Sequence, residues 1–147
     1  MKKFPLDQEI HQQYYEEIVT KLKKDPFAKQ LGIRLLSVGE GTATAEVKVN
    51  EHMLNMHGTA HGAIIFALAD VVFAVASNSY GRTAVALSMN IGFMAASFAG
   101  ERLRATAIEE KKNHRTSWYR IKVENEKEVI AILDALAYRK KDYFVRI

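Results

Sequence analysis

The first part of the chain carries hydrophobic residues at every fourth position, the spacing of one face of a helix. These positions are Leu6, Ile10, Tyr14, Ile18 and Leu22. With Asp7 placed to cap it, the stripe predicts a helix over about residues 7–24. Asp25 and Pro26 are then typical of the start of a short helix, and Gly32 of its end.

The period changes from four residues to two over residues 41–49. The apolar positions of this segment are Ala43, Ala45, Val47 and Val49. A strand with one face in the core and the other in water has this pattern. Residues 50–61 lose the alternation and are rich in His, Asn and Gly, so a loop is expected there.

Residues 62–78 are apolar on nearly every side of the helix that they predict, and Asp70 is their only charged residue. At a rise of 1.5 Å per residue this helix would be about 25 Å long. A membrane span takes roughly 20 apolar residues, and an acidic side chain near its centre is costly in lipid. We therefore expect a helix buried in the core of a soluble protein, and no membrane association.

Four more segments alternate with a period of two, and short turns join the later ones. They are residues 83–94, 102–108, 117–124 and 129–138. The tail from residue 139 is first basic and then apolar, and its pattern assigns it to no element. Helices and strands are segregated after the long helix. The sequence therefore predicts an α+β fold, with an antiparallel sheet curved around that helix.

The length and composition are those of an ordinary globular protein. A length of 147 residues favours one domain over residues 1–147. The absence of cysteine excludes disulfides, thiolate metal ligands and a cysteine nucleophile. The first 15 residues hold two lysines without the apolar stretch of a secretory signal, so a cytoplasmic protein is expected.

The net charge is modestly positive: 21 basic and 17 acidic residues give +4. This balance favours anionic partners in general. The basic residues are spread out, and no aromatic stacking platform accompanies them, so no nucleic-acid binding is expected. Those near the late strands form a solvated face or hold the phosphates of a carrier such as coenzyme A. They are Arg102, Arg104, Lys111, Lys112, Arg115 and residues 139–141.

Asp70 needs an explanation, because burying an unpaired charge costs several kcal/mol. One explanation is a structural carboxylate that is hydrogen-bonded to a neighbouring helix cap. The other is a general base or nucleophile in an apolar cleft, where burial raises the pKa of the acid. The residues around Asp70 leave both explanations open.

Gly62 lies where the loop meets the long helix. A helix N-terminus offers unpaired N–H groups and the positive end of the dipole, and a glycine lets a ligand approach closely. This position is either a plain helix start or a site for a developing oxyanion. Asp70 follows by eight residues, which is about 12 Å along a helix. If both act on one bond they come from two subunits, so we expect a dimer with antiparallel central helices.

Asn55, His57 and His61 flank the start of this helix. The two histidines have the spacing of a helical zinc pair, but Gly58 lies between them and no Glu follows His57. Loop hydrogen bonding explains them better, and no metal site is expected. Asn55 is either a turn residue or a group that orients a carbonyl or a water molecule.

The run NMHGTAHGAIIFALADVVFAVASN, residues 55–78, closely resembles the hotdog-fold acyl-CoA thioesterases of the phenylacetic-acid-degradation type. The shared pattern is Asn55, then His61-Gly62-Ala63, then Asp70 and Asn78. Looser similarity extends over about residues 26–138. The spacing of the His-Gly pair and the Asp on one apolar helix makes the resemblance specific.

The resemblance implies an acyl-CoA thioesterase with the hotdog fold, in which an antiparallel sheet wraps a long helix. It implies homodimers with shared sites, often paired into homotetramers, and neither a metal nor a cofactor beyond the coenzyme A of the substrate. Asp70 matches the catalytic carboxylate. Gly62 matches the residue whose N–H polarises the thioester carbonyl, and Asn55 a polar residue near the attacking water. The candidate substrate-binding residues are His61, Ala63, Phe66, Ser88 and Arg115.

Two departures from the family pattern bear on the substrate. The second glycine of the His-Gly-Gly pattern is replaced by Ala63, whose methyl group is expected to narrow the acyl pocket. A hydroxyl residue that holds the water in some relatives is replaced by Ala86, although Ser88 is expected on the same face of that strand. Three apolar residues either line the acyl cavity or are plain core: Phe66, Phe73 and Met89.

Two other functions fit the same fold. A non-catalytic acyl-CoA sensor would usually carry a DNA-binding segment, but the predicted helix over residues 7–24 has no partner for a helix-turn-helix. An enoyl-CoA hydratase would need a histidine one or two turns from Asp70, and none occurs there. The sequence also has no phosphate-binding glycine loop and no G-x-S-x-G elbow. Thioester hydrolysis is therefore the predicted function.

Overall fold

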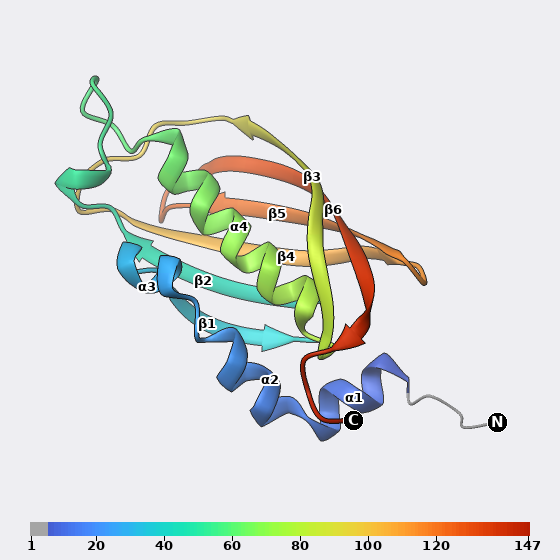
Figure 1. Ribbon diagram of the computed structural model, residues 1–147. Helices are drawn as coiled ribbons and strands as arrows, with labels where there is room; N and C mark the ends of the chain where they lie inside the picture. The colour runs from blue at the N-terminus through green and yellow to red at the C-terminus, as the bar shows by residue number, and fades with distance from the viewer. Residues whose placement is uncertain (1–5) are drawn as a thin grey trace.

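The computed structural model describes residues 6–147. The first five residues, on which the expectation about a secretory signal partly rests, lie outside the described residues. One antiparallel sheet of six strands curves around a long helix, and shorter helices lie beside them (Figure 1). This arrangement confirms the predicted α+β class and the hotdog fold.

The N-terminal segment forms two helices: α1 (Asp7–Gln13) and α2 (Tyr15–Leu22). Tyr14 leaves helical geometry between them, with φ −109° and ψ 18°. The single helix predicted over residues 7–24 is therefore wrong in this detail. With this bend, Ile10 and Ile18 are both fully buried and pack together with Val145 near the C-terminus. Ile10 and Ile18 of the predicted apolar stripe are therefore buried, but the stripe bends at Tyr14.

The third helix, α3 (Pro26–Leu31), begins and ends as predicted. The Asp25 carboxylate accepts a hydrogen bond from the Ala28 N–H at 3.0 Å, and Pro26 stands in the first turn. Gly32 ends the helix in the left-handed region, at φ 74°. A residue with a side chain adopts that conformation only at some cost, which explains the glycine.

Six strands build the sheet in the order β1-β2-β4-β5-β6-β3, and each neighbouring pair is antiparallel. Their bounds are β1 (Arg34–Gly39), β2 (Thr42–Lys48), β3 (Arg82–Phe93), β4 (Arg102–Lys112), β5 (Thr116–Glu124) and β6 (Val129–Tyr143). The sequence predicted all of them except β1. In β1 only Val38 is buried, because this strand lies at the edge of the sheet and lacks the usual apolar alternation.

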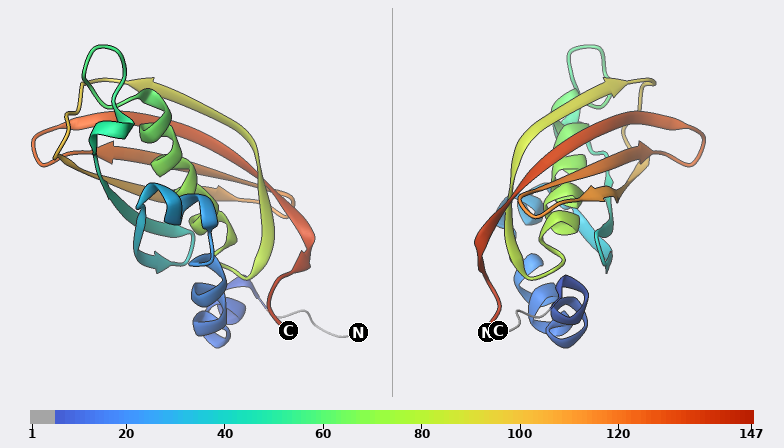
Figure 2. Two further views of the ribbon diagram at one scale, coloured as in Figure 1. Left: turned by 60° about the vertical axis from the view of Figure 1, so that its left-hand side comes forward. Right: turned by 90° about the vertical axis from the view of Figure 1, so that its right-hand side faces the viewer.

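The long helix, α4 (Gly62–Asn78), has the predicted bounds and lies on the concave side of the sheet (Figures 1 and 2). Its sheet-facing side is buried, with Leu68 and Val72 fully enclosed. A stripe on its other side stays at least partly exposed: Gly62, Phe66, Asp70, Ala74 and Asn78. No helix within residues 6–147 is long and apolar enough to cross a membrane.

The edge strand β3 departs most from its prediction. Its register against β6 shifts between Ala86 and Ser88, and such a bulge changes which face the following side chains take. The apolar residues expected on one face are therefore not buried together. Val85 and Leu87 are 41% and 56% exposed, whereas Met89 packs against the core. No other strand of the described chain pairs with the free edge of β3.

The C-terminal tail, which the sequence assigned to no element, continues β6 to Tyr143 and ends beside α1 (Figure 1). Arg139 lies in this extension. It is only 4% exposed and donates hydrogen bonds to the Asp7 carboxylate and the Asn113 carbonyl. The tail therefore ties the N-terminal helices to the sheet.

Candidate active site

The N-terminus of α4 presents one backbone N–H without an acceptor. His61 caps the helix: its Nδ1 atom accepts the Ala63 N–H at 3.0 Å, and its carbonyl accepts the Ile64 N–H at 3.0 Å. No atom within residues 6–147 accepts the N–H of Gly62. This N–H stays available at the positive end of the helix dipole, where it would stabilise a carbonyl oxygen that gains negative charge.

The cap also fixes the tautomer of the neutral His61 ring. Because Nδ1 accepts a hydrogen bond, the neutral ring carries its proton on Nε2. His61 is exposed, so this Nε2–H is a second donor near the helix end. Ala63 is exposed as well, and its expected effect on the acyl pocket stays a prediction.

Phe93 covers the side of Gly62. A Cβ atom added to Gly62 would lie 3.1 Å from Phe93 Cζ, tighter than most real Cβ contacts. The Phe93 ring is 55% exposed in the single chain, so it forms an apolar wall beside the available N–H. The sequence placed Phe93 only in a strand, because this contact depends on how β3 crosses α4.

Asp70 lies two turns further along the same stripe of α4 and is half-buried. Burial raises the pKa of its carboxyl, and the negative charge of Asp25 raises that pKa further. Within the described residues no hydrogen bond or ion pair lowers it. The explanation of Asp70 as a carboxylate bonded to a helix cap therefore fails. A carboxylate made more basic in this way suits a general base.

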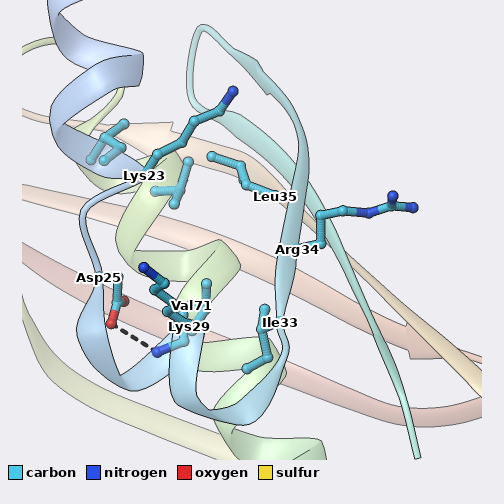
Figure 3. Close-up of a pocket in the computed structure, with 10 residues that line it drawn as sticks. Lys23, Asp25, Lys29, Ile33, Arg34, Leu35 and Val71 are labelled. Carbon is cyan, nitrogen blue, oxygen red and sulfur yellow. Dashed lines mark hydrogen bonds between the residues drawn. The ribbon is translucent and has the colours of Figure 1, made fainter.

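Asp25 lines a hollow of about 420 Å³ beside α4 (Figure 3). Much of the wall is apolar and includes Val71 and Val75 of α4. Three cations also line it: Lys23, Lys29 and Arg34. The sequence identified Asp25 only as a helix cap. Its effect on Asp70 depends on the packing of α3 against α4, which no local pattern reveals.

Asn55 organises the loop in front of α4, which projects beyond the sheet (Figure 1). Its Oδ1 accepts the N–H groups of His57 at 2.9 Å and Thr59 at 3.2 Å, and its Nδ2 donates to Thr59 Oγ1 at 2.9 Å. Asn55 is therefore a turn residue, yet one hydrogen of Nδ2 remains for a water or a carbonyl. Because Oδ1 already accepts two bonds, a contact with substrate would use Asn55 as a donor.

Ser88 is not where the sequence predicted it. Ala86 pairs with Ala137, which is fully buried, whereas Ser88 pairs with Leu136. Directly paired residues share a face of the sheet, and Ala137 and Leu136 alternate along β6. Ser88 and Ala86 therefore lie on opposite faces, because the bulge adds one residue between them. The Ser88 hydroxyl is on the side of the sheet away from α4.

The other candidate substrate contacts are divided among several places. Phe73 is plain core: it is 1% exposed and packs edge-to-face on Tyr119, with ring centroids 5.5 Å apart. Phe66 is half-buried on the exposed stripe of α4, midway between Gly62 and Asp70. Arg115 lines a different hollow, beside α1. No three His, Asp or Glu side chains of the described part of the chain gather as a metal ion would require.

One chain does not bring Gly62 and Asp70 to a single carbonyl. They are eight residues apart on one helix, which separates them by about 12 Å. The Gly62 N–H and the Asp70 carboxylate of one chain are therefore too far apart to act on the same thioester.

Residues 57–132 match the family described as Thioesterase superfamily. The chain is 38% identical, over 118 residues, to the acyl-coenzyme A thioesterase PaaI of Escherichia coli (strain K12). That alignment covers 80% of this chain and 84% of the relative.

Two solved structures have a similar fold. The E. coli PaaI protein, from the phenylacetic acid degradation operon, gives a TM-score of 0.83 at 33% identity, covering 94% of this chain and 99% of that chain. The smu.793 protein of Streptococcus mutans UA159, bound to acetyl CoA, gives a TM-score of 0.71 at 25% identity. This second similarity covers 74% of this chain and 88% of that chain.

Proposed function

This chain belongs to the thioesterase superfamily, and we propose that it hydrolyses aryl- or short- to medium-chain acyl-CoA thioesters. The proposal rests on the exposed stripe of α4. Within the described chain, it holds an unpaired Gly62 N–H at one end and Asp70, a carboxylate of raised pKa, two turns away. A relative with 38% identity is itself named an acyl-coenzyme A thioesterase.

The reaction uses the N–H and the carboxylate in turn. The Gly62 N–H donates to the carbonyl oxygen of the thioester, and this bond strengthens as the oxygen gains charge. Asp70 accepts a proton from the water that attacks the carbonyl carbon. The carbon–sulfur bond then breaks, and the thiolate of coenzyme A leaves with the proton that Asp70 returns. The products are a carboxylic acid and free coenzyme A.

An alternative route has Asp70 attack the carbonyl carbon itself, so that water hydrolyses the resulting mixed anhydride. A single turnover in water labelled with heavy oxygen tests this route. Label in the Asp70 carboxylate requires direct attack followed by addition of water to the Asp70 carbon of the anhydride, because general-base catalysis labels only the product acid.

The proposed unit is a homodimer that joins Gly62 of one subunit to Asp70 of the partner subunit. The separation of about 12 Å within one chain supports this arrangement. So does the open edge of β3, which carries large apolar residues exposed in the single chain: Val85, Leu87 and Phe93, followed by Met94. Pairing of β3 with a second β3 would cover these residues and lay two α4 helices antiparallel. Two dimers would then form the homotetramer implied by the family.

Free-thiol release from a panel of acyl-CoA esters tests the activity. The panel contains phenylacetyl, hydroxyphenylacetyl, benzoyl and straight-chain esters. We expect Asp70→Asn to lower kcat by about 10²–10⁴-fold, because the base is lost while the side-chain volume is kept. The control is Asp134→Asn, which removes an exposed carboxylate on the outer side of β6. Equal turnover by wild type and Asp70→Asn would show that Asp70 is not catalytic.

The same assay separates the alternatives from different functional classes. A non-catalytic acyl-CoA-binding protein would bind the esters without releasing thiol. A hydratase would consume an enoyl-CoA and leave its thioester intact. Thiol release that depends on Asp70 is expected only of the thioesterase.

A further inference from the structure

A second hollow, of about 490 Å³, lies at the other end of α4 from Gly62. It is formed by the start of α1, the start of β3, the turn between β4 and β5, and the end of β6. In Figure 1 the start of β3, the end of β6 and α1 lie near the C-terminal end of α4. Most of the side chains that line it are basic: Arg82, His114, Arg115, Arg139 and Lys141.

The positive charge of this hollow is poorly compensated. Among the described residues, Asp7 is the only acidic one that lines the hollow, and it already forms ion pairs with Arg139 and with Lys112, the latter at 3.0 Å. Within residues 6–147, none of the other three cations forms an ion pair with a carboxylate: Arg82, Arg115 and Lys141. Asp142 lies near Arg82, but it is hydrogen-bonded to Thr83.

Two of the guanidinium groups are fixed in place. Arg82 and Arg139 are only 8% and 4% exposed. Arg82 donates to the backbone carbonyls of Lys140 and Arg139, so its hydrogen bonds hold its position but leave its charge unneutralised. Arg139 has Asp7 as its counter-charge, whereas no carboxylate of the described chain pairs with Arg82, and burying such an unpaired charge is costly.

Arg115 adds a donor without an acceptor. Its Nη1 atom is buried and donates to no acceptor within the described part of the chain. A buried donor left in this state destabilises the fold unless something binds it, and such groups are rare in folded proteins. The guanidinium groups of Arg82 and Arg115 have no carboxylate partner within residues 6–147, and planar forks of this kind match the geometry of a phosphate group.

We propose that this arginine cluster, Arg82, Arg115 and Arg139 with Lys141, binds a phosphate group. The ligand is either free phosphate or a phosphate on the nucleotide of coenzyme A. The second source rests on the proposed function. In the proposed dimer, antiparallel α4 helices bring the arginine cluster of one subunit toward the end where Gly62 of the partner subunit lies. The cluster would then hold the distal end of a substrate whose thioester is at that Gly62.

Direct binding is the first test, with inorganic phosphate and adenosine 3′,5′-bisphosphate as separate probes in titration calorimetry. We expect Arg115→Gln to weaken binding by at least about tenfold, a typical loss for one charged hydrogen-bond partner. Arg120→Gln is the matched control, because Arg120 is also on β5 but is exposed and pairs with Asp134. Wild-type protein that binds neither probe, or equal binding by Arg115→Gln and wild type, would overturn the proposal.

Kinetics then distinguish the two sources of phosphate. If the substrate supplies it, Arg115→Gln raises the KM for an acyl-CoA ester about tenfold. The matching acyl-pantetheine has no phosphate, so its KM should change no more in Arg115→Gln than in Arg120→Gln. If free phosphate is the ligand, both KM values stay near those of the control while phosphate binding is still lost. A protein that cleaves no thioester would refute the proposed function, yet the binding test would still decide the phosphate site.

Discussion

Gly62 allows its N–H to be tested separately from its missing side chain. Proline fits the first position of a helix but has no N–H. His61, at φ −62° and ψ 139°, already has the extended conformation that precedes a proline. Gly62→Ala keeps the N–H and introduces the same Cβ contact with Phe93. We expect Gly62→Pro to lower kcat about 10²–10³-fold further than Gly62→Ala, as for the loss of one oxyanion donor.

Thiol release measures both variants, and circular dichroism shows whether each retains its helices. If folded Gly62→Pro and Gly62→Ala turn over at the same rate, the donor to the thioester carbonyl is another group. The exposed Nε2–H of His61 is then the next candidate.

Asp25 offers a test of the electrostatics at Asp70. Asn in its place keeps the oxygen that caps α3 through the Ala28 N–H but removes the negative charge. The pKa of Asp70 is raised first by burial and then by Asp25, so Asp25→Asn lowers it. The ionised base form of Asp70 then persists to lower pH. We therefore expect the acidic limb of the kcat/KM profile to move to lower pH.

The pH profile of Asp134→Asn serves as the control for this shift, since Asp134 is exposed on the outer side of β6. Its acidic limb should coincide with that of wild type. A limb that stays in place in Asp25→Asn, or moves to higher pH, would show that the limb does not report Asp70.

The sequence identified the residues whose chemistry conflicts with their surroundings, and missed those that act through packing. Asp70 could be found because a lone acid in an apolar helix is unusual, and Gly62 because it starts that helix. Asp25 and Phe93 act through contacts between distant segments, with Asp70 and Gly62 respectively. Ser88 was placed on the wrong face because a one-residue bulge leaves no trace in the alternation.

At the scale of elements, Gly81 controls how the N-terminal helices dock. A Cβ atom added there would lie 2.8 Å from Val145 Cγ2 and 3.2 Å from Ile10 Cγ2. Gly32 shares its φ of 74° but has open space around it. Gly32→Ala should therefore lose only about 1–2 kcal/mol of unfolding free energy from backbone strain. Gly81→Ala should lose about 1–3 kcal/mol more, because packed side chains must move.

Urea unfolding of the two variants measures this difference. The additional loss should appear as a lower midpoint, with helix α1 the first region to lose protection from hydrogen exchange. Equal losses in Gly81→Ala and Gly32→Ala would mean that the contacts with Val145 and Ile10 relax without cost.

Elements with one buried side were predictable, and elements at edges were not. Helix α4 and strand β2 bury a regular set of positions, so their patterns matched the structure closely. Strand β1 buries only Val38 and was missed. The bend at Tyr14 divides a stripe that the sequence shows as continuous. These differences arise from tertiary packing, which a pattern of neighbouring residues does not contain.

At the scale of the whole molecule, two features of the single chain lack a partner. On the exposed stripe of α4, the Gly62 N–H is too far from the Asp70 carboxylate for both to act on one bond. At its free edge, β3 exposes apolar residues that no neighbouring strand of the described chain covers. Both features would be completed by the same event, pairing with a second copy through β3. Stability of the dimer and catalysis are therefore expected to depend on the same contact.

Leu87→Lys tests this link, with Ile108→Lys as its control. In the single chain the Leu87 side chain is 56% exposed on the edge strand β3. Ile108 is similarly exposed, at 52%, but it is on β4, which has a neighbouring strand on both sides. An unpaired lysine buried at the dimer contact costs several kcal/mol, so the dimer Kd should rise by at least about 10²-fold. Sedimentation should then show monomers of Leu87→Lys, and its specific activity should rise with protein concentration. Ile108→Lys should keep a constant specific activity. A fully active Leu87→Lys monomer would place the complete site within one chain.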